Sequence, residues 1–221
     1  MLTILTLAIG VDYRKSLAKA LNSKRLYAEK HSYTYVEGGE EWWDRTRPIA
    51  WSKIPFLMDQ LQRMPEGALV WLSDADVLIT NLSLKVEDHV MPFLPDDKDM
   101  LLVFDACKHL NSGNILMRNT AWTREFWSRV NERTDCTYHI WWENMAIIKL
   151  IQETSEYNEK IQYTTQHKLF NAYLMGLPDQ PLWEPGDFLV HFAGVYKPEK
   201  MAALIEEIEQ GRIPRLDMYH P

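Results

Sequence analysis

Apolar and polar positions follow two different periods along the first third of the chain. Short continuous apolar runs, which are typical of buried strands, occupy residues 2–9, 33–36 and 68–72. Between them, residues 13–31 and 49–64 carry apolar side chains at helical spacing, which predicts two helices. Strands that alternate with helices in this way favour a mostly parallel sheet.

The second half continues the pattern with shorter elements. Further strands are expected at residues 100–104, 114–117, 161–164 and 188–192, and further helices at 121–131, 142–153 and 198–210. A turn is expected around Asn111-Ser112-Gly113. The chain contains no internal repeat, low-complexity segment or linker. We therefore expect residues 1–221 to form a single Rossmann-like α/β domain, with a central mixed, mostly parallel sheet flanked by helices.

Composition and charge exclude several classes of protein. A chain of 221 residues suits one well-buried domain. The net charge is -7, and the sequence has no cluster of basic residues. This argues against a nucleic-acid partner, because phosphate binding needs clustered Lys and Arg. No run approaches the roughly 18 apolar residues of a membrane helix, so no membrane span is predicted. The two cysteines, Cys107 and Cys136, favour a reducing compartment in which both are free thiols. A single disulfide between them is the alternative.

Two aspartates follow directly on the apolar strand at residues 68–72. Asp74 and Asp76, separated by Ala75, would stand at the rim of the sheet, where paired carboxylates can hold a hard divalent cation such as Mn²⁺ or Mg²⁺. Such a cation can neutralise a diphosphate. The alternative is that one aspartate caps a helix while the other is solvated.

A second group of residues near the carboxyl terminus fits the same chemistry. His191 ends an apolar run, and a neutral imidazole is a competent metal ligand beside two carboxylates. Gly194 lets the backbone approach a phosphate, and Lys197 would place a positive charge at the start of a helix. The alternative is a core histidine bonded to a carbonyl, with a lysine in a first helical turn. Because ligands collect at the carboxyl ends of strands in open α/β sheets, we expect Gly10, Asp74 and His191 to converge.

The motifs Asp-x-Asp and His-x-x-Gly-x-x-Lys together resemble retaining glycosyltransferases of the GT-A type. More specific segments are Trp51-Ser52-Lys53-Ile54-Pro55, residues 70–76, Asn111-Ser112-Gly113-Asn114-Ile115-Leu116-Met117-Arg118-Asn119, residues 27–33 and Phe170-Asn171-Ala172-Tyr173. In this order and spacing, from about residue 5 to residue 198, they resemble glycosyltransferase family 34, which includes galactosyl-, mannosyl- and xylosyltransferases.

The resemblance implies roles for the two motifs. Asp74 and Asp76 would bind Mn²⁺ or Mg²⁺ with His191 as the third protein ligand, and Asp76 would also reach the donor ribose or sugar as a candidate catalytic residue. The implied contacts to the rest of the donor are Ala8 and Gly10 beside the nucleotide base, Ala75 between the aspartates, and Gly194 and Lys197 at the diphosphate.

Further positions would contact the donor sugar by the same resemblance. Lys53 would face the donor, or else be a solvated helix cation. Asn111 and Ser112 would line the sugar pocket, or else form a turn held by an Asx bond. Glu143 and Asn144 are candidate catalytic residues, at a place where family members carry an acidic residue and then Gln. Asn144 is shorter than that Gln, and Glu143 has the alternative role of an acid favoured by the helix dipole.

The implied activity is that of a metal-dependent glycosyltransferase. It would move a hexosyl group from a nucleotide-diphosphate sugar, UDP in preference to GDP, to a hydroxyl of a glycan acceptor, with retention of configuration. One alternative is a metal-dependent sugar-nucleotide hydrolase or a pyrophosphorylase-like enzyme, although residues 7–12 are not the Gly-rich basic loop of a pyrophosphorylase. The other is a non-catalytic carbohydrate-binding domain on the same fold.

The amino terminus bears on the expected location. Residues 1–10 are apolar but short, without a basic leader or a small-residue cleavage site, so they are interpreted as the first strand instead of a signal peptide. Eukaryotic members of the family usually carry a membrane anchor and a stem before the catalytic domain. We therefore expect a cytoplasmic protein, or a catalytic domain that belongs to a longer multidomain protein.

Overall fold

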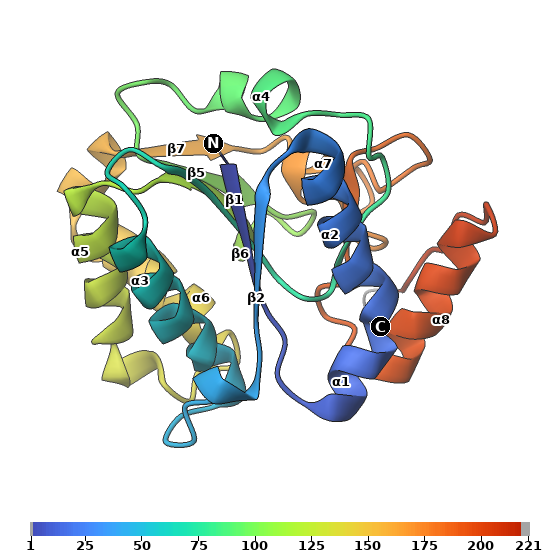
Figure 1. Cartoon of the computed structure of the whole chain (residues 1–221), viewed down its shortest axis with the longest axis horizontal. Coiled ribbons are helices and arrows are strands. Elements are labelled where there is room, and N and C mark those ends of the chain that lie inside the picture. The colour runs from blue at the N-terminus through green and yellow to red at the C-terminus, as the bar shows by residue number, and fades with distance from the viewer. Residues whose placement is uncertain (1, 218–221) are drawn as a thin grey trace.

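The central sheet is built from the apolar runs of the sequence. The computed structural model describes residues 2–217, and this range contains a six-stranded sheet in the order β2-β1-β3-β6-β5-β7 (Figure 1). Its strands are β1 Leu2–Leu7, β2 Thr34–Gly38, β3 Leu69–Ser73, β5 Met100–Phe104, β6 Leu110–Arg118 and β7 Ile161–Thr164. β1 runs parallel to β2 and β3, and β5 parallel to β7, whereas β6 is antiparallel to β3 and β5. The predicted α/β fold with a mixed, mostly parallel sheet is confirmed.

One face of the sheet is covered by three helices, α3 (Lys53–Arg63), α5 (Ala121–Asn131) and α6 (Trp142–Glu153). Successive side chains along a strand point to opposite faces, so Leu5 and Leu72 are buried in this layer. Figure 1 shows the three helices gathered on the same side of the strands.

The other face of the sheet buries Trp71, which lies between Leu72 and Val70 on β3 and therefore points away from them. Tyr27 of α2 (Ala18–His31) packs edge-on against the Trp71 ring, with 6.0 Å between ring centroids. The short helices α4 and α7 complete this layer, at Val86–His89 and His167–Phe170.

A second, two-stranded sheet joins the two segments that carry the motifs. β4 (Val77–Ile79) follows β3 after a tight turn and pairs antiparallel with β8 (Leu189–His191). In this pairing Val77 lies opposite His191, so segments far apart in the sequence meet one residue beyond Asp76. The expected strand at residues 188–192 is confirmed with narrower bounds, while β4, only three residues long, is missing from the sequence prediction.

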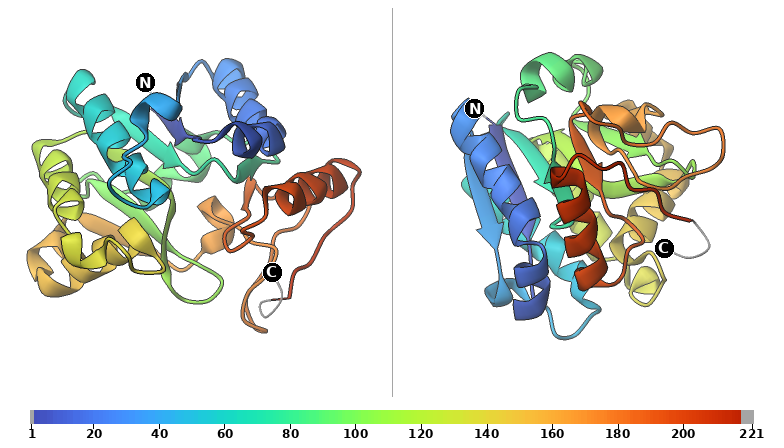
Figure 2. Two further views of the ribbon diagram at one scale, coloured as in Figure 1. Left: turned by 90° about the horizontal axis from the view of Figure 1, so that it is seen from below. Right: turned by 90° about the vertical axis from the view of Figure 1, so that its right-hand side faces the viewer.

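The small sheet is covered by α1 (Val11–Ser16), α2 and α8 (Pro198–Glu209). Both views in Figure 2 place α8 beside the helices of the amino-terminal segment. Short 3₁₀ helices connect the remaining elements, at Glu40–Trp42, Ile49–Ser52, Met91–Phe93, Thr134–Cys136 and Ser155–Glu159.

Two predicted helices have different starts from those expected. The helix expected over residues 13–31 is divided at Leu17, whose backbone angles (φ -98°, ψ 12°) leave the helical region and separate α1 from α2. The helix expected over residues 49–64 begins as a 3₁₀ turn and becomes α-helical only at Lys53. Pro55 then lies in the first turn of α3, where its missing N–H has no intrahelical partner to lose.

The turn expected around residues 111–113 is wrong, because these residues belong to β6. The chain reverses earlier, where the Asp105 carboxylate accepts hydrogen bonds from the backbone N–H groups of Cys107 and His109, each at 2.8 Å. Polar residues can occupy the start of β6 because that end of the strand borders a cavity. Asn111 nevertheless accepts the local bond expected of a turn, from the backbone N–H of Gly113 at 2.9 Å.

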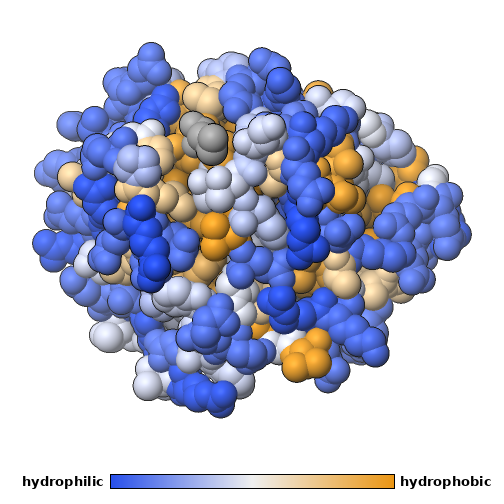
Figure 3. Space-filling model, in the orientation of Figure 1, coloured by the Kyte–Doolittle hydropathy of each residue, from blue (hydrophilic) through white to orange (hydrophobic). Residues whose placement is uncertain are grey.

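The surface agrees with the composition. The face shown in Figure 3 is mostly hydrophilic, with apolar atoms in small separate patches. Within residues 2–217, no helix has both the length and the apolar character that a membrane crossing requires. Cys107 and Cys136 are not joined in a disulfide.

The buried side chain of Asn119 is expected to contribute measurably to the stability of the fold. Its buried side-chain N–H groups donate to the carbonyls of Leu61, Met64 and Pro65 at 2.9 to 3.1 Å, which satisfies the end of α3. Asn119→Ala would remove these buried hydrogen bonds and is expected to lower the free energy of unfolding by about 1–3 kcal/mol. Urea unfolding measures this, with Asn22→Ala, at an exposed position, as the control. Equal stability of the two variants would contradict the prediction.

Candidate active site

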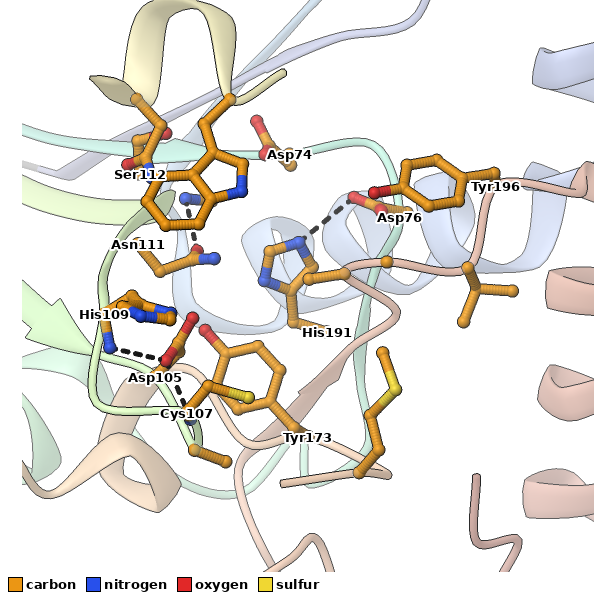
Figure 4. A pocket seen from close by; sticks show the side chains of 18 of the residues that line it. Asp74, Asp76, Asp105, Cys107, His109, Asn111, Ser112, Tyr173, His191 and Tyr196 are labelled. Atoms are coloured by element: carbon orange, nitrogen blue, oxygen red, sulfur yellow. Dashed lines mark hydrogen bonds and ion pairs between the residues drawn. The ribbon is translucent and has the colours of Figure 1, made fainter. Parts of the chain in front are cut away.

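A cavity opens where the carboxyl end of β3, the start of β6, the end of β8 and the start of α6 meet. Its volume is about 600 Å³, which is within the range of roughly 300–1,000 Å³ typical of small-molecule sites. The residues that Figure 4 labels around it are Asp74, Asp76, Asp105, Cys107, His109, Asn111, Ser112, Tyr173, His191 and Tyr196. The cavity therefore gathers acidic, amide and imidazole groups from distant parts of the chain.

Asp74, Asp76 and His191 lie together on the cavity wall, as the sequence predicts, and are called the Asp-Asp-His group below. One ligand atom from each lies within 4.8 Å of the other two, and Nε2 of His191 is 3.4 Å from Oδ1 of Asp76. The backbone N–H of Asp74 donates to the carbonyl of Gly113 at 2.8 Å, and that of Phe192 donates to the carbonyl of Asp76 at 3.0 Å. Neighbouring strands thus hold both aspartates in place.

The Asp-Asp-His group fits a divalent cation. Two carboxylates and one imidazole are a donor set that suits Mn²⁺, and Mg²⁺ is commonly bound through carboxylates together with phosphate oxygens. Burial alone would raise the pKa of Asp76, but the neighbouring His191 and the Lys24 ammonium outweigh burial and lower this pKa. Asp76 is therefore ionised at neutral pH, which is the state that binding a cation requires.

Gly113 allows His191 to lie against β6. A methyl group in place of its hydrogen would come within 2.1 Å of Cε1 of His191, well inside van der Waals contact. The Asp-Asp-His group therefore depends on a glycine in the neighbouring strand, at a position that the sequence motif contains but does not explain.

Lys53 joins the cation-binding side of the cavity to the start of α6. Its Nζ lies 2.8 Å from Oδ1 of Asp74 and 2.8 Å from Oε1 of Glu143. Burial alone would lower the pKa of Lys53, but the two carboxylates outweigh burial and raise this pKa above its ordinary value. The lysine is thus a buried ammonium that stands behind the two acids, not a solvated helix cation and not part of the cavity wall.

Glu143 and Asn144 bring two hydrogen-bond acceptors to the cavity. Trp142 precedes them with a φ of 41°, a left-handed conformation that is uncommon for an aromatic residue and is often found at functional sites. Among residues 2–217, Oε2 of Glu143 and Oδ1 of Asn144 are buried without a hydrogen-bond partner. Asn144 donates its amide N–H to the carbonyl of Leu110 at 2.9 Å, which fixes its oxygen as the remaining acceptor. Both residues line the cavity, and each keeps one acceptor without a partner.

The other expected binding residues divide into two sets. Asn111, Ser112 and Gly194 line the cavity, and the hydroxyl of Ser112 lies 3.4 Å from Oε1 of Glu143. The residues that do not line it are Ala8 and Ala75, which are buried, Gly10, whose N–H donates to the Glu40 carboxylate, and Lys197, which is exposed at the start of α8.

The sequence of the chain matches a known family over most of its length. The galactosyl transferase GMA12/MNN10 family, glycosyltransferase family 34, matches residues 2–96 and 93–202. The chain belongs to this family. The resemblance drawn from the sequence motifs is thereby confirmed.

Curated relatives that match the chain include proteins of fission yeast. An uncharacterized alpha-1,2-galactosyltransferase of Schizosaccharomyces pombe is 24% identical over 214 residues, which cover 80% of this chain and 55% of the relative. An alpha-1,2-galactosyltransferase of the same organism is 24% identical over 219 residues, covering 79% of this chain and 55% of the relative. The chain thus spans about half the length of the curated relatives that it matches.

Solved structures of glycosyltransferases share the fold. A glycosyltransferase involved in the glycosylation of the major capsid of PBCV-1 superposes with a TM-score of 0.72 at 15% identity, covering 93% of this chain and 98% of that one. The galactosyltransferase LgtC, in complex with donor and acceptor sugar analogs, gives a TM-score of 0.53 at 11% identity and covers 98% of both chains. The fold is the GT-A glycosyltransferase fold expected from the sequence.

Several residues of this family 34 site escaped the sequence prediction. Asp105 and His109, in the turn between β5 and β6, both line the cavity. Asn171 appears in a family segment, and its buried amide contacts His191. Strand pairings between distant segments bring these residues to the cavity, β6 with β3 and Ala172 with Val190, so no local pattern could identify them.

Lys24 lies beneath the loop that carries the aspartates. Its side chain is fully buried, and its Nζ donates to the carbonyls of Val77 at 2.5 Å and Ala75 at 3.3 Å. Burial disfavours the ammonium more than the nearby acids favour it, which lowers the pKa of Lys24 to about 7. The helical pattern of α2 gives no signal for this role, since the same lysine on an exposed face would be solvated.

The lowered pKa of Lys24 predicts how stability depends on pH. Between the folded pKa of about 7 and the ordinary lysine pKa of about 10.4, the unfolded chain binds more protons at this position, so stability rises with pH. Lys24→Met should flatten that rise in the free energy of unfolding, measured by urea unfolding across this interval. Lys30→Met, at an exposed position of the same helix, is the control. An unchanged pH slope in Lys24→Met would contradict the prediction.

Proposed function

We propose that the protein is a metal-dependent glycosyltransferase that moves a hexosyl group from a nucleotide-diphosphate sugar to a hydroxyl of a glycan acceptor. The observation that carries the proposal is that one cavity holds the Asp-Asp-His group on its wall and, at the start of α6, two side chains with unpaired hydrogen-bond acceptors. These side chains are Glu143 and Asn144. The yeast relatives are named as alpha-1,2-galactosyltransferases, which supports UDP-galactose as the first donor to test.

The metal-binding end would take the donor diphosphate. Asp74, Asp76 and His191 would hold Mn²⁺ or Mg²⁺, which supplies Lewis-acid stabilisation of the departing diphosphate. Gly194 lies on the cavity wall with a φ of 81°, a conformation that favours glycine and leaves its backbone accessible. Lys197 is exposed three residues further on, and we propose that it adds a positive charge near the diphosphate.

The start of α6, which Lys53 links to Asp74, would orient the donor sugar. Oε2 of Glu143 and Oδ1 of Asn144 accept hydrogen bonds, so they suit hydroxyl groups and exclude groups that can only accept. Lys53 and Ser112 hold the other carboxylate oxygen of Glu143, which fixes the direction of its free one. Such pre-positioning reduces the entropy that a bound sugar would otherwise lose on reaching the reactive geometry.

The transfer would retain configuration by a front-face route. The acceptor oxygen bonds to the anomeric carbon on the face from which the diphosphate leaves, the bond from that carbon to the diphosphate oxygen breaks, and the hydroxyl proton passes to a diphosphate oxygen. This route requires no enzyme nucleophile. Glu143, held by Lys53, then serves to bind the sugar.

Donor turnover tests the metal assignment. Purified protein with Mn²⁺ and a panel of UDP- and GDP-sugars should release nucleoside diphosphate from one donor, and EDTA should stop the release. Asp76→Asn should lower this turnover by more than about 100-fold, because even outer partners of metal ligands contribute roughly 10- to 100-fold. Asp88→Asn, on the exposed side of α4, is the charge-matched control.

Two outcomes would contradict this proposal. Wild-type turnover by Asp76→Asn would remove the aspartate from the metal site. No release from any donor, together with no metal-dependent nucleotide binding, would favour a carbohydrate-binding domain over an enzyme.

Glu143→Gln separates sugar recognition from diphosphate binding. The amide keeps the shape of the carboxylate but loses its charge, and a hydrogen bond to a charged group contributes about 1.5–3 kcal/mol. The value of kcat/KM for the donor should therefore fall about 10- to 100-fold, while calorimetric binding of UDP with Mn²⁺ stays unchanged. Glu156→Gln, at an exposed position after α6, should behave as wild type. A matched loss of UDP affinity in Glu143→Gln would mean that Glu143 contributes to nucleotide binding and not to sugar recognition alone.

A further inference from the structure

A line of buried side-chain hydrogen bonds leads from the core to the imidazole of the Asp-Asp-His group. The indole N–H of Trp71 donates to Oδ1 of Asn114 at 2.9 Å, and Nδ2 of Asn114 donates to Oδ1 of Asn171 at 3.0 Å. Oδ1 of Asn171 then lies 2.9 Å from Nδ1 of His191. All four side chains are buried, so every polar atom along this line depends on its neighbours for hydrogen bonds.

The direction of these bonds follows from the chemistry of the indole. A tryptophan N–H can only donate, so the atom of Asn114 that faces it must be the oxygen. The NH₂ of Asn114 then faces Asn171 and requires an oxygen there. Since the same Asn171 oxygen faces Nδ1 of His191, that ring nitrogen must carry a hydrogen.

A second donor, independent of the first, fixes Asn171 in the same orientation. The backbone N–H of Gly113 donates to Oδ1 of Asn111 at 2.9 Å, and the same oxygen accepts from Nδ2 of Asn171 at 3.0 Å. The other N–H of Asn171 donates to the hydroxyl of Tyr173. Reversing the Asn171 amide would set oxygen against oxygen at Asn111 and NH₂ against NH₂ at Asn114. The orientation is therefore determined from both sides.

We infer that Asn171 is a positioning residue that keeps the hydrogen of His191 on Nδ1 and reserves Nε2 for a cation. Nε2 is the ring nitrogen that faces Asp76, at 3.4 Å from its Oδ1. Binding a cation requires a lone pair on that nitrogen, and a hydrogen bond at the other nitrogen decides which one carries it. The inference rests on the proposed function only in that the Asp-Asp-His group binds a divalent cation.

Nitrogen-15 NMR of His191 tests the inference without turnover. Spectra are recorded above the ordinary histidine pKa of about 6.5, with and without Mg²⁺, which is diamagnetic. Nδ1 should carry its hydrogen in both states, and Mg²⁺ should leave Nε2 without one. A wild-type spectrum with an unprotonated Nδ1 would overturn the inference, so the result does not depend on whether a variant folds.

Two variants distinguish positioning from packing. Asn171→Asp keeps an acceptor opposite Nδ1 and should retain the Nδ1 hydrogen. Asn171→Leu removes the acceptor, so the hydrogen should no longer be confined to Nδ1, and Mn²⁺ affinity measured by calorimetry should fall about 10- to 100-fold. A purely structural role would not separate the two variants by their His191 spectra.

Asn119→Ala is the matched control, because it removes an equally buried amide outside the cavity and should leave the His191 spectrum unchanged. Retention of the Nδ1 hydrogen and of full Mn²⁺ affinity in Asn171→Leu would overturn the inference. Failure to turn over any sugar donor would leave these spectra and affinities as expected, so the inference and the proposed function fail separately.

Discussion

The antiparallel pairing of β4 with β8 is the constraint on which the site depends. Asp74 follows the carboxyl end of β3 in the central sheet, but β3 alone cannot supply an imidazole. By leaving the sheet after Ser73 and pairing Val77 with His191, the chain places the two aspartates and His191 on one cavity wall. Backbone bonds from Gly113 and Phe192 then fix the two aspartates. The smaller sheet thus determines the chemistry of the cavity that carries the Asp-Asp-His group.

Charge is distributed unevenly across this cavity wall. Lys53 is shared between Asp74 and Glu143, so these two acids have a fixed positive partner. Lys24, by contrast, donates to two backbone carbonyls and interacts with Asp76 only through space. Within residues 2–217, Asp76 is paired with His191 and with no lysine or arginine. A divalent cation at this point would add positive charge beside the acid that lacks a lysine partner.

The sequence predicted the parts of this arrangement that have local signals. Apolar runs and helical spacing identified the main strands and helices, and an apolar strand followed by Asp74 and Asp76 identified the rim of the sheet. What it could not predict depends on long-range contacts. β4 is too short to show a period, and the polar start of β6 resembles a turn because its neighbours are a cavity and not solvent. The pairing of Lys53 with two acids, which only the fold brings together, has no signal in the sequence.

Asn171 shows why such residues are invisible in a single sequence. Its amide uses both lone pairs and both hydrogens within the buried network, to Asn114, His191, Asn111 and Tyr173. None of these partners except Tyr173 is near it in the chain. The orientation of its amide is set by two groups that can only donate, the Trp71 indole N–H and a backbone N–H. A donor in the apolar core therefore helps to decide which nitrogen of His191 carries the hydrogen. The β3 strand consequently serves the site twice, because its end carries Asp74 and its buried face carries Trp71.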